Sequence, residues 1–419
     1  MRRLVLAALL AGCSTTPAPA VDAGPQYLPA CTTPAPAFRH AAFYETLKAD
    51  ARAFSVVDGD WLEDQGDATF YGLAFHARVA KDDPRYAAAK ARSLALMKKA
   101  DFLKDDLQEL VMAPLGIIDD MDASGDRSAL PLLDDFMGRL GTLVKTFGWY
   151  IEVGGDRSWA MRLYGPTSIS ALVGLVNAQY ALYVKGDSGN ARLAWVVEQE
   201  KHIHEKAWNG SFYRFSPTVS RLDLYPNVAM IALEARLYQL TGDPAYKKRA
   251  VDLYEAIQPL KLTEPPVQRY YSQYSAALMG AKTHDYSTLS SHNYVSLALY
   301  LLNEITCDPK YVEEADRIVD GMSQLRGDYC LSDVHTTACA PVCVTKEVCV
   351  AGVCGADRCG KAVLHHWIDG RNALPADAEF LCTGCNMQML WTLWYRQERV
   401  GKGVRPTIPA TPIAIDAGG

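Results

Sequence analysis

A short turn that recurs along the chain constrains its fold more than any other feature. Each copy holds an Asp, usually followed by Pro or Ser, and then the pattern of a helix. The Asp side chain can accept hydrogen bonds from the free N–H groups of that helix, and Pro fits its first position because no N–H is needed there. The chain therefore contains helix–turn–helix repeats. Four copies are plain and a fifth is weaker: AKDDPRYAAAKA from Ala80, VKGDSGNARLA from Val184, LTGDPAYKKRA from Leu240, ITCDPKYVEEA from Ile305, and ASGDRSALPLL from Ala123.

The helices on the two sides of a turn differ in their apolar pattern. Residues 224–240 are apolar on almost every side, which indicates a buried helix. After the turn, the apolar residues fall on one stripe, as in a helix that covers others: Tyr246, Ala250, Leu253, Tyr254 and Ile257. The predicted helix caps are Asp83, Asp126, Asp187, Asp243 and Asp308. We predict alternating outer and inner helices over residues 38–53, 66–80, 84–99, 105–118, 127–146, 167–185, 189–206, 225–241, 244–258, 287–305, 309–325 and 385–399.

This alternation, with its Gly-Asp-Pro-x-Tyr turns, resembles the six-hairpin (α/α)6 toroid over residues 38–399. That superfamily includes glycoside hydrolases, unsaturated-uronyl hydrolases, polysaccharide lyases and N-acylglucosamine 2-epimerases. The resemblance implies an all-α ring in which the last inner helix closes against the first outer one, and an activity on a carbohydrate. The turns belong to the scaffold and do not specify the chemistry. A tetratricopeptide-type solenoid is the structural alternative, but its fixed repeat length is missing here.

The N-terminus has the pattern of an export signal. MRRLVLAALLAGC places two arginines before a short apolar run and resembles a bacterial lipobox, which implies that Cys13 is lipidated. Ser14 after this cysteine implies an outer-membrane, extracytoplasmic location. We predict a signal over residues 1–13, a Pro/Ala/Thr-rich tether over 14–37 and a loose tail over 400–419.

Charge and hydropathy exclude two other classes. The net charge is −6, and no long run of Lys or Arg is present, so a nucleic-acid partner is not expected. No stretch of about 18 apolar residues is seen, so the lipid is the only membrane contact that we predict.

Ten cysteines besides Cys13 point to disulfides, because an even number in an exported chain is typical of them. Residues 330–362 form a Cys-rich insert without a helical pattern, with a tight hairpin around Gly352. It suits a lid, a protein contact or simple stiffening. A zinc site at Cys382 and Cys385 with nearby histidines is the alternative, but an oxidising compartment favours disulfides, so we predict no metal there. The ten residues are Cys31, Cys307, Cys330, Cys339, Cys343, Cys349, Cys354, Cys359, Cys382 and Cys385.

The resemblance places the site on the face formed by the outer-to-inner loops and the starts of the inner helices. Five of the eight tryptophans lie there: Trp61, Trp149, Trp159, Trp208 and Trp367. Aromatic faces in a cleft suit the C–H faces of sugars, although these rings would equally pin long loops to the body. The other predicted substrate-binding residues are Tyr71, Arg162, Asn227, Asn293, His366 and Asn386.

Acidic residues on the same loops are the predicted catalytic groups. Glycoside hydrolysis needs an acid and a second carboxylate across the bond. Asp64 or Asp67 would supply one of them, and Glu152 or Asp285 the other, although Asp67 also suits a helix cap. His292 suits the acid–base chemistry of an epimerase or lyase. A glycoside hydrolase is the predicted function, with a glycan-binding or structural envelope protein as the non-catalytic alternative.

The stretch DDMDASGD resembles a calcium loop. Asp120, Asp122 and Asp126 match its spacing, but Pro131 stands where a bidentate Glu is expected. The stretch also falls at a repeat turn, so helix capping is favoured and no cofactor is predicted.

Overall fold

The computed structural model describes residues 31, 34–50, 55, 66–102, 107–148, 158–184, 186–262, 269–270, 273–274, 286–323, 326–327, 348–350, 353–355, 363–364, 367–369 and 383–402. These contain twelve α-helices, and each predicted helix is present. The helices are α1 (Ala41–Asp50), α2 (Gly66–Val79), α3 (Pro84–Lys99), α4 (Leu107–Ser124), α5 (Leu130–Thr146), α6 (Ser158–Val184), α7 (Gly186–Ala207), α8 (Leu224–Thr241), α9 (Pro244–Ile257), α10 (Leu289–Thr306), α11 (Pro309–Ser323) and α12 (Thr383–Tyr395).

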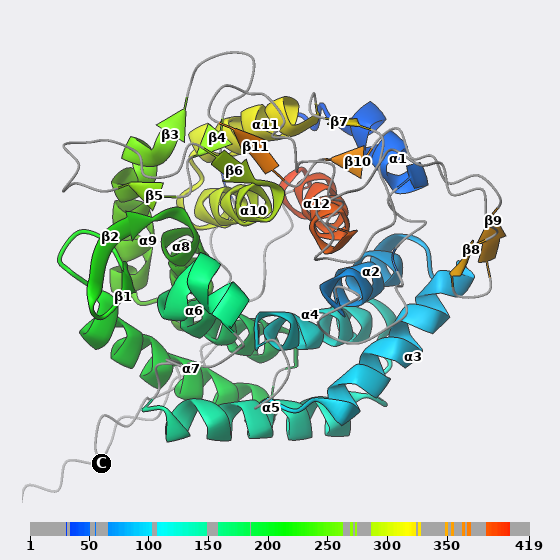
Figure 1. The fold of residues 1–419 in the computed structure, drawn as a ribbon, viewed down its shortest axis with the longest axis horizontal. Coiled ribbons are helices and arrows are strands. Elements are labelled where there is room, and N and C mark those ends of the chain that lie inside the picture. The colour runs from blue at the N-terminus through cyan, green and yellow to red at the C-terminus, as the bar shows by residue number, and fades with distance from the viewer. Residues whose placement is uncertain are drawn as a thin grey trace, which may run out of the picture.

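The even-numbered helices form a closed inner ring (Figure 1). Each packs on the next, from α2 through α4, α6, α8 and α10 to α12, and α12 packs on α2. The odd-numbered helices lie outside this ring, and α1 packs on α12, as the resemblance implies. The chain therefore has the (α/α)6 toroid fold and is not an open solenoid.

The burial of the helices follows the predicted patterns. In α8 every residue from Leu224 to Leu240 except Tyr238 is buried. The buried residues of α9 are the five of its predicted stripe. Among the described residues, the segment Gly165–Val184 of α6 is long and apolar enough to cross a membrane. It is 94% buried inside the protein, as in a core helix.

The repeat turns are built on capping aspartates. Asp83, Asp243 and Asp308 each accept the backbone N–H two residues on, at 3.0, 2.9 and 3.0 Å, which confirms three predicted caps. Asp126 also accepts the N–H two residues on, at 2.9 Å, but α5 begins only at Leu130, so this bond stabilises the turn itself. α7 begins at Gly186, so Asp187 lies inside the helix and the prediction that it caps this helix is wrong.

The segment before α1 is fixed to the ring. Cys31 forms a disulfide with Cys307, at the end of α10. Arg396, just after α12, donates to the carbonyl of Pro36 at 2.7 Å. The body therefore holds Cys31 and Pro36, which both lie in the predicted tether over residues 14–37. Cys385 is also disulfide-bonded; the side chains of the other predicted cysteines lie outside the described residues.

Short strands accompany the loops between helices. β1 (Arg214–Ser216), β2 (Val219–Asp223) and β5 (Gln273–Tyr274) form an antiparallel sheet that leads into α8. The predicted hairpin around Gly352 is confirmed. The two-stranded pairs are β3 (Lys261–Leu262) with β4 (Arg269–Tyr270), β6 (Tyr286–Thr288) with β11 (Trp367–Asp369), β7 (Arg326–Gly327) with β10 (Val363–Leu364), and β8 (Val348–Val350) with β9 (Val353–Gly355).

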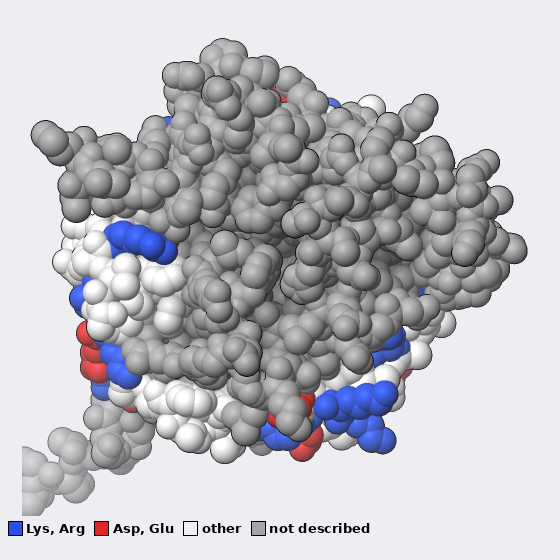
Figure 2. Space-filling model, in the orientation of Figure 1, with Lys and Arg blue, Asp and Glu red and all other residues white. Residues whose placement is uncertain are grey.

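Charged side chains of the described residues lie around the edge of the face seen in Figure 2. Both signs are present there. This mixed rim agrees with the nearly balanced composition of the chain.

Candidate functional site

Tyrosines from three inner helices meet near the starts of those helices. The hydroxyls of Tyr71 (α2) and Tyr294 (α10) lie 3.0 Å apart, and they lie 3.2 and 3.1 Å from the Sδ of Met112 (α4). The ring of Tyr225 (α8) packs edge-to-face on Tyr294 at 5.1 Å. Four inner helices thus build one aromatic floor with phenol groups on it, and we call these four residues the tyrosine floor.

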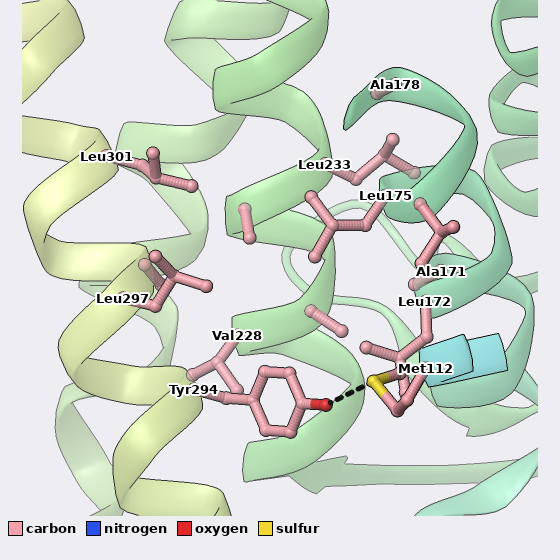
Figure 3. Close-up of a cluster of buried hydrophobic side chains, with 14 of the residues drawn as sticks. Met112, Ala171, Leu172, Leu175, Ala178, Val228, Leu233, Tyr294, Leu297 and Leu301 are labelled. Atoms are coloured by element: carbon pink, nitrogen blue, oxygen red, sulfur yellow. Dashed lines mark hydrogen bonds between the residues drawn. The ribbon is translucent and has the colours of Figure 1, made fainter. Parts of the chain in front are cut away.

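The ring is filled beyond this floor. Figure 3 shows Leu172, Leu175, Val228, Leu297 and Leu301 packed along the helices past the contact between Tyr294 and Met112, and all five are buried. Apolar side chains therefore occupy the ring on that side of the floor.

Ion pairs link the inner helices toward the ends at which these helices finish. Arg236 on α8 pairs with Glu304 on α10 at 3.4 Å, and Arg78 on α2 pairs with Asp119 on α4 at 2.6 Å. The indole of Trp391 on α12 donates to Asp119 at 2.7 Å. Since these residues come from five inner helices, they join the ring at the end where the helices finish.

Asp223 is a buried carboxyl at the start of an inner helix. It ends β2 and directly precedes α8, two residues before Tyr225, and is 3% exposed. Its side chain does not cap α8; it accepts from the Nε of Arg221 at 2.7 Å. Burial raises the pKa of Asp223 to about 7, against the lowering effect of Arg221. A carboxyl with a pKa near neutrality can both hold and release a proton, as a general acid must.

The hairpin that carries Asp223 is seated on a break in α6. The helix departs from helical geometry at Gly165, with φ 77° and ψ 159°. A Cβ there would lie 2.6 Å from the ring of Phe215. Thr167 donates to the carbonyl of Phe215 at 3.0 Å. The sequence Tyr-Gly-Pro-Thr thus lets β1 approach the helix closely and fixes the hairpin.

Asn227 supports the turn at Asp223. Its amide Nδ2 donates to the carbonyls of Tyr213 and Asp223 at 3.0 and 2.7 Å, and its Oδ1 accepts the N–H of Tyr213 at 2.9 Å. Asn227 is one of the predicted substrate-binding residues, and that role stays a prediction. Both ends of its amide are bonded to backbone groups, so the side chain shapes this loop.

Trp208 lies on the outer wall. Its ring stacks on that of His204 at 5.4 Å and packs against that of Tyr213 at 5.1 Å. These contacts agree with the alternative in which the loop tryptophans pin a loop to the body.

His292, Asn293 and Asn386 are buried near the starts of α10 and α12, and their roles in a site stay predictions. The Nε2 of His292 accepts the N–H of Tyr270 at 2.9 Å, so this nitrogen carries a lone pair and is already bonded. Asn293 donates to the carbonyl of Cys385 at 2.7 Å and so joins α10 to α12.

The remaining predicted site residues stay predictions. Trp61, Asp64, Trp149, Glu152, Asp285 and His366 lie outside the described residues. For Asp67, Trp159, Arg162 and Trp367 only the backbone is described. It places Asp67 in the first turn of α2, and Trp159 and Arg162 before the break in α6. Trp367 pairs with Thr288, the residue directly before α10.

The stretch that resembles a calcium loop is used for ion pairs with basic side chains. Asp120 and Asp126 contact Lys90 at 2.7 and 3.0 Å, and Asp122 contacts Arg78 at 2.6 Å. In the described part of the chain, no group of three His, Cys, Asp or Glu side chains is arranged to hold a metal ion.

Asp223, Arg221 and most of the tyrosine floor are not among the site residues predicted from the sequence. Asp223 directly precedes a helix pattern that is apolar on almost every side, and the rule that sites lie at the starts of inner helices would have found it. Arg221 lies two residues earlier, on the same side of the strand. Tyr225, Tyr294 and Met112 sit within apolar helix patterns, where the sequence indicates only core.

Several solved structures share this fold at low sequence identity. The D-mannose isomerase structure has a TM-score of 0.56 at 12% identity and covers 88% of this chain and 99% of its own. An unsaturated glucuronyl hydrolase specific for heparin has a TM-score of 0.55 at 12% identity, covering 86% and 98%. Cellobiose 2-epimerase from Bacillus thermoamylovorans B4167 has a TM-score of 0.54 at 13% identity, covering 85% and 98%.

These structures are all six-hairpin glycosidase-like toroids, which confirms the predicted architectural resemblance. No protein-family model matches the chain, and no curated relative matches it either.

Proposed function

We propose that the protein is a carbohydrate-active enzyme, a glycoside hydrolase in which Asp223 transfers the proton. The observation that carries this proposal is a buried carboxyl with a pKa near 7 at the start of an inner helix, two residues before Tyr225 of the tyrosine floor. The names of the three similar structures, an isomerase, a hydrolase and an epimerase of sugars, support a carbohydrate as the substrate class.

In this mechanism the protonated Asp223 donates to the glycosidic oxygen as the bond breaks. The second carboxylate comes from the predicted set Asp64, Asp67, Glu152 and Asp285. It either activates water or attacks the anomeric carbon, depending on its separation from Asp223. The rings of the tyrosine floor would pack on the C–H faces of the sugar.

His292 supports an epimerase or lyase less well than Asp223 supports a glycoside hydrolase. A general base needs a free lone pair aimed at the substrate. The Nε2 of His292 is bonded to a backbone N–H, and this leaves Asp223 as the better-supported proton-transfer group.

The test is a thermal-shift screen of the full-length protein against defined oligosaccharides, followed by product analysis. A ligand at 100 times its dissociation constant should stabilise the fold by about 2.7 kcal/mol. We expect a hit that is consumed by the wild type and persists with Asp223→Asn. A hit that the wild type leaves intact would favour a glycan-binding protein. The absence of any shift or turnover would overturn the proposal.

We also propose an extracytoplasmic location with a lipid on Cys13. The disulfide between Cys31 and Cys307 supports export, because such bonds persist in oxidising compartments. Mass spectrometry of the protein recovered from a bacterial envelope should show a diacylglyceryl adduct that is missing from Cys13→Ser. An unmodified wild-type N-terminus would contradict the anchor.

A further inference from the structure

The hairpin beside Asp223 carries a residue whose position suggests a role in the site. We propose that Phe215 is a positioning residue: its ring holds the guanidinium of Arg221 against Asp223 and so controls how readily that carboxyl gives up its proton. This inference rests on the proposed function of Asp223.

Three side chains form a continuous series of contacts. The guanidinium carbon of Arg221 lies 4.2 Å from the centre of the Phe215 ring, a cation–π contact. The Nε of the same guanidinium donates to Asp223 at 2.7 Å. Within the described residues, these are the ring contact and the ion pair that hold Arg221. Its side chain is 29% exposed, so without the ring it would be free to turn into water.

Phe215 is itself firmly placed. Its ring lies so close to the backbone at Gly165 that a Cβ there would be 2.6 Å away. Its carbonyl accepts from Thr167 at 3.0 Å. Because both contacts come from α6, an inner helix, the ring is a rigid platform for Arg221.

Arg221 is the charged group that faces Asp223 from the described elements around it. Across the hairpin, Arg214 donates to the carbonyls of residues 206, 207 and 217, and is engaged there. β5 places Gln273 opposite Asp223, and the nearby stretch 165–170 of α6 has no ionisable side chain. Arg221 lowers the pKa of Asp223 while burial raises it, so loosening Arg221 should raise that pKa further.

The experiment follows the titration of Asp223 through the stability of the folded protein, which needs no substrate. The free energy of unfolding is measured between pH 4 and pH 9 for the full-length wild type, Phe215→Leu and Arg221→Gln. Each protein is also measured with Asp223→Asn added, and that unfolding free energy is subtracted at each pH. The pH dependence that remains belongs to Asp223. Phe212→Leu, in the same loop, is the matched control, and Phe215→Tyr keeps an aromatic face for rescue.

We expect the midpoint of this titration to move upward by about one pH unit in Arg221→Gln, and in the same direction in Phe215→Leu. In the double variant that combines Phe215→Leu with Arg221→Gln, the midpoint should move no further than in Arg221→Gln alone. Phe212→Leu and Phe215→Tyr should titrate like the wild type. The high-pH limb of kcat/KM should shift with the midpoint.

A Phe215→Leu protein that loses stability equally at every pH, with the wild-type midpoint, would overturn the positioning role. If Phe215→Leu does not fold, a wild-type midpoint in Arg221→Gln would overturn it as well. If the midpoint moves as expected but no oligosaccharide is turned over, the positioning role stands and the proposed enzymatic function fails.

Discussion

At the scale of single residues, Asp223 is held where its charge is unfavourable. Burial raises the pKa of this carboxyl from 3.8 to about 7 despite the ion pair with Arg221. The folded protein therefore binds this proton more tightly than the unfolded chain does, and the free energy of unfolding falls as the pH rises from about 4 to about 7. A difference of about three pKa units corresponds to a loss on the order of 4 kcal/mol above pH 7.

We therefore expect Asp223→Asn to raise the free energy of unfolding at pH 8 and to change it much less at pH 4, while abolishing turnover. Urea unfolding at the two pH values measures both effects. Asp126→Asn is a control of opposite sign, because hydrogen bonds to Ser128 lower the pKa of Asp126 to about 2. It should lower stability at pH 8. A destabilised Asp223→Asn at pH 8 would contradict the burial argument.

The sequence predicts single residues well where their role is local. Asp83 and Asp243 cap the next helix through an N–H two residues away, so a short stretch of sequence suffices to find them. The role of Asp223 depends on Arg221, Phe215 and the burial that the hairpin provides. These conditions are set by contacts between elements, and no local pattern reveals them.

At the scale of elements, the break in α6 determines where the β1–β2 hairpin sits. Gly165 adopts a left-handed φ of 77°, and its Cα faces the ring of Phe215. Gly165→Ala should cost at least about 1–2 kcal/mol for the backbone conformation alone. It should cost more because the ring must move, and Arg221 and Asp223 should be displaced with it.

Thermal unfolding and the pH profile of activity test this prediction together. Gly138→Ala is the matched control, since Gly138 lies exposed within α5 and an added Cβ there meets nothing within 4 Å. It should gain up to about 1 kcal/mol from helix propensity. If Gly165→Ala has the stability and the activity of the wild type, the break in α6 does not determine the position of the hairpin.

Helices and strands differ in how far the sequence predicts them. α8 and α9 have apolar patterns of many turns, so their ranges and their burial are predicted within a few residues. α4 runs to Ser124, past its predicted end at 118, because the acidic residues there pair with α2 and α3 rather than ending the helix. Strands of two to five residues, such as β2 and β5, are too short to show a period of two.

At the scale of the whole molecule, closure of the ring joins the start of the chain to its end. α1 and α2 pack on α12, and Arg396 binds the carbonyl of Pro36. The resemblance to the toroid implies this closure, whereas the alternation of helix patterns alone would also fit an open solenoid. It does not predict the pairing of Cys31 with Cys307, since spacing along the chain carries no information about which cysteines meet.

Cys307 occupies a position of the repeat turn that favours glycine. In the turn between α8 and α9 the corresponding residue is Gly242, with φ 72°, and Cys307 adopts φ 62° in the turn between α10 and α11. A cysteine in this conformation is strained, so another interaction must offset the cost of the strain. The disulfide to Cys31 fixes the segment before α1 to this end of the ring.

The last prediction separates the disulfide from the backbone strain. The bond joins residues 276 apart, so the chain-entropy model sets an upper limit of about 6 kcal/mol on its contribution. Cys31→Ala combined with Cys307→Ala should lose both that contribution and the bond that supports the left-handed residue. Cys31→Ala combined with Cys307→Gly loses the disulfide but relieves the strain, and should be more stable than the alanine pair by about 1 kcal/mol.

Urea unfolding of the wild type and the two double variants gives the two differences directly. Variants as stable as the wild type would show that the tie between Cys31 and the ring adds nothing to closure. Equal stability of the alanine and glycine pairs would show that the turn relaxes once the bond is gone, so that the left-handed conformation of Cys307 is a consequence of the disulfide rather than a property of the repeat.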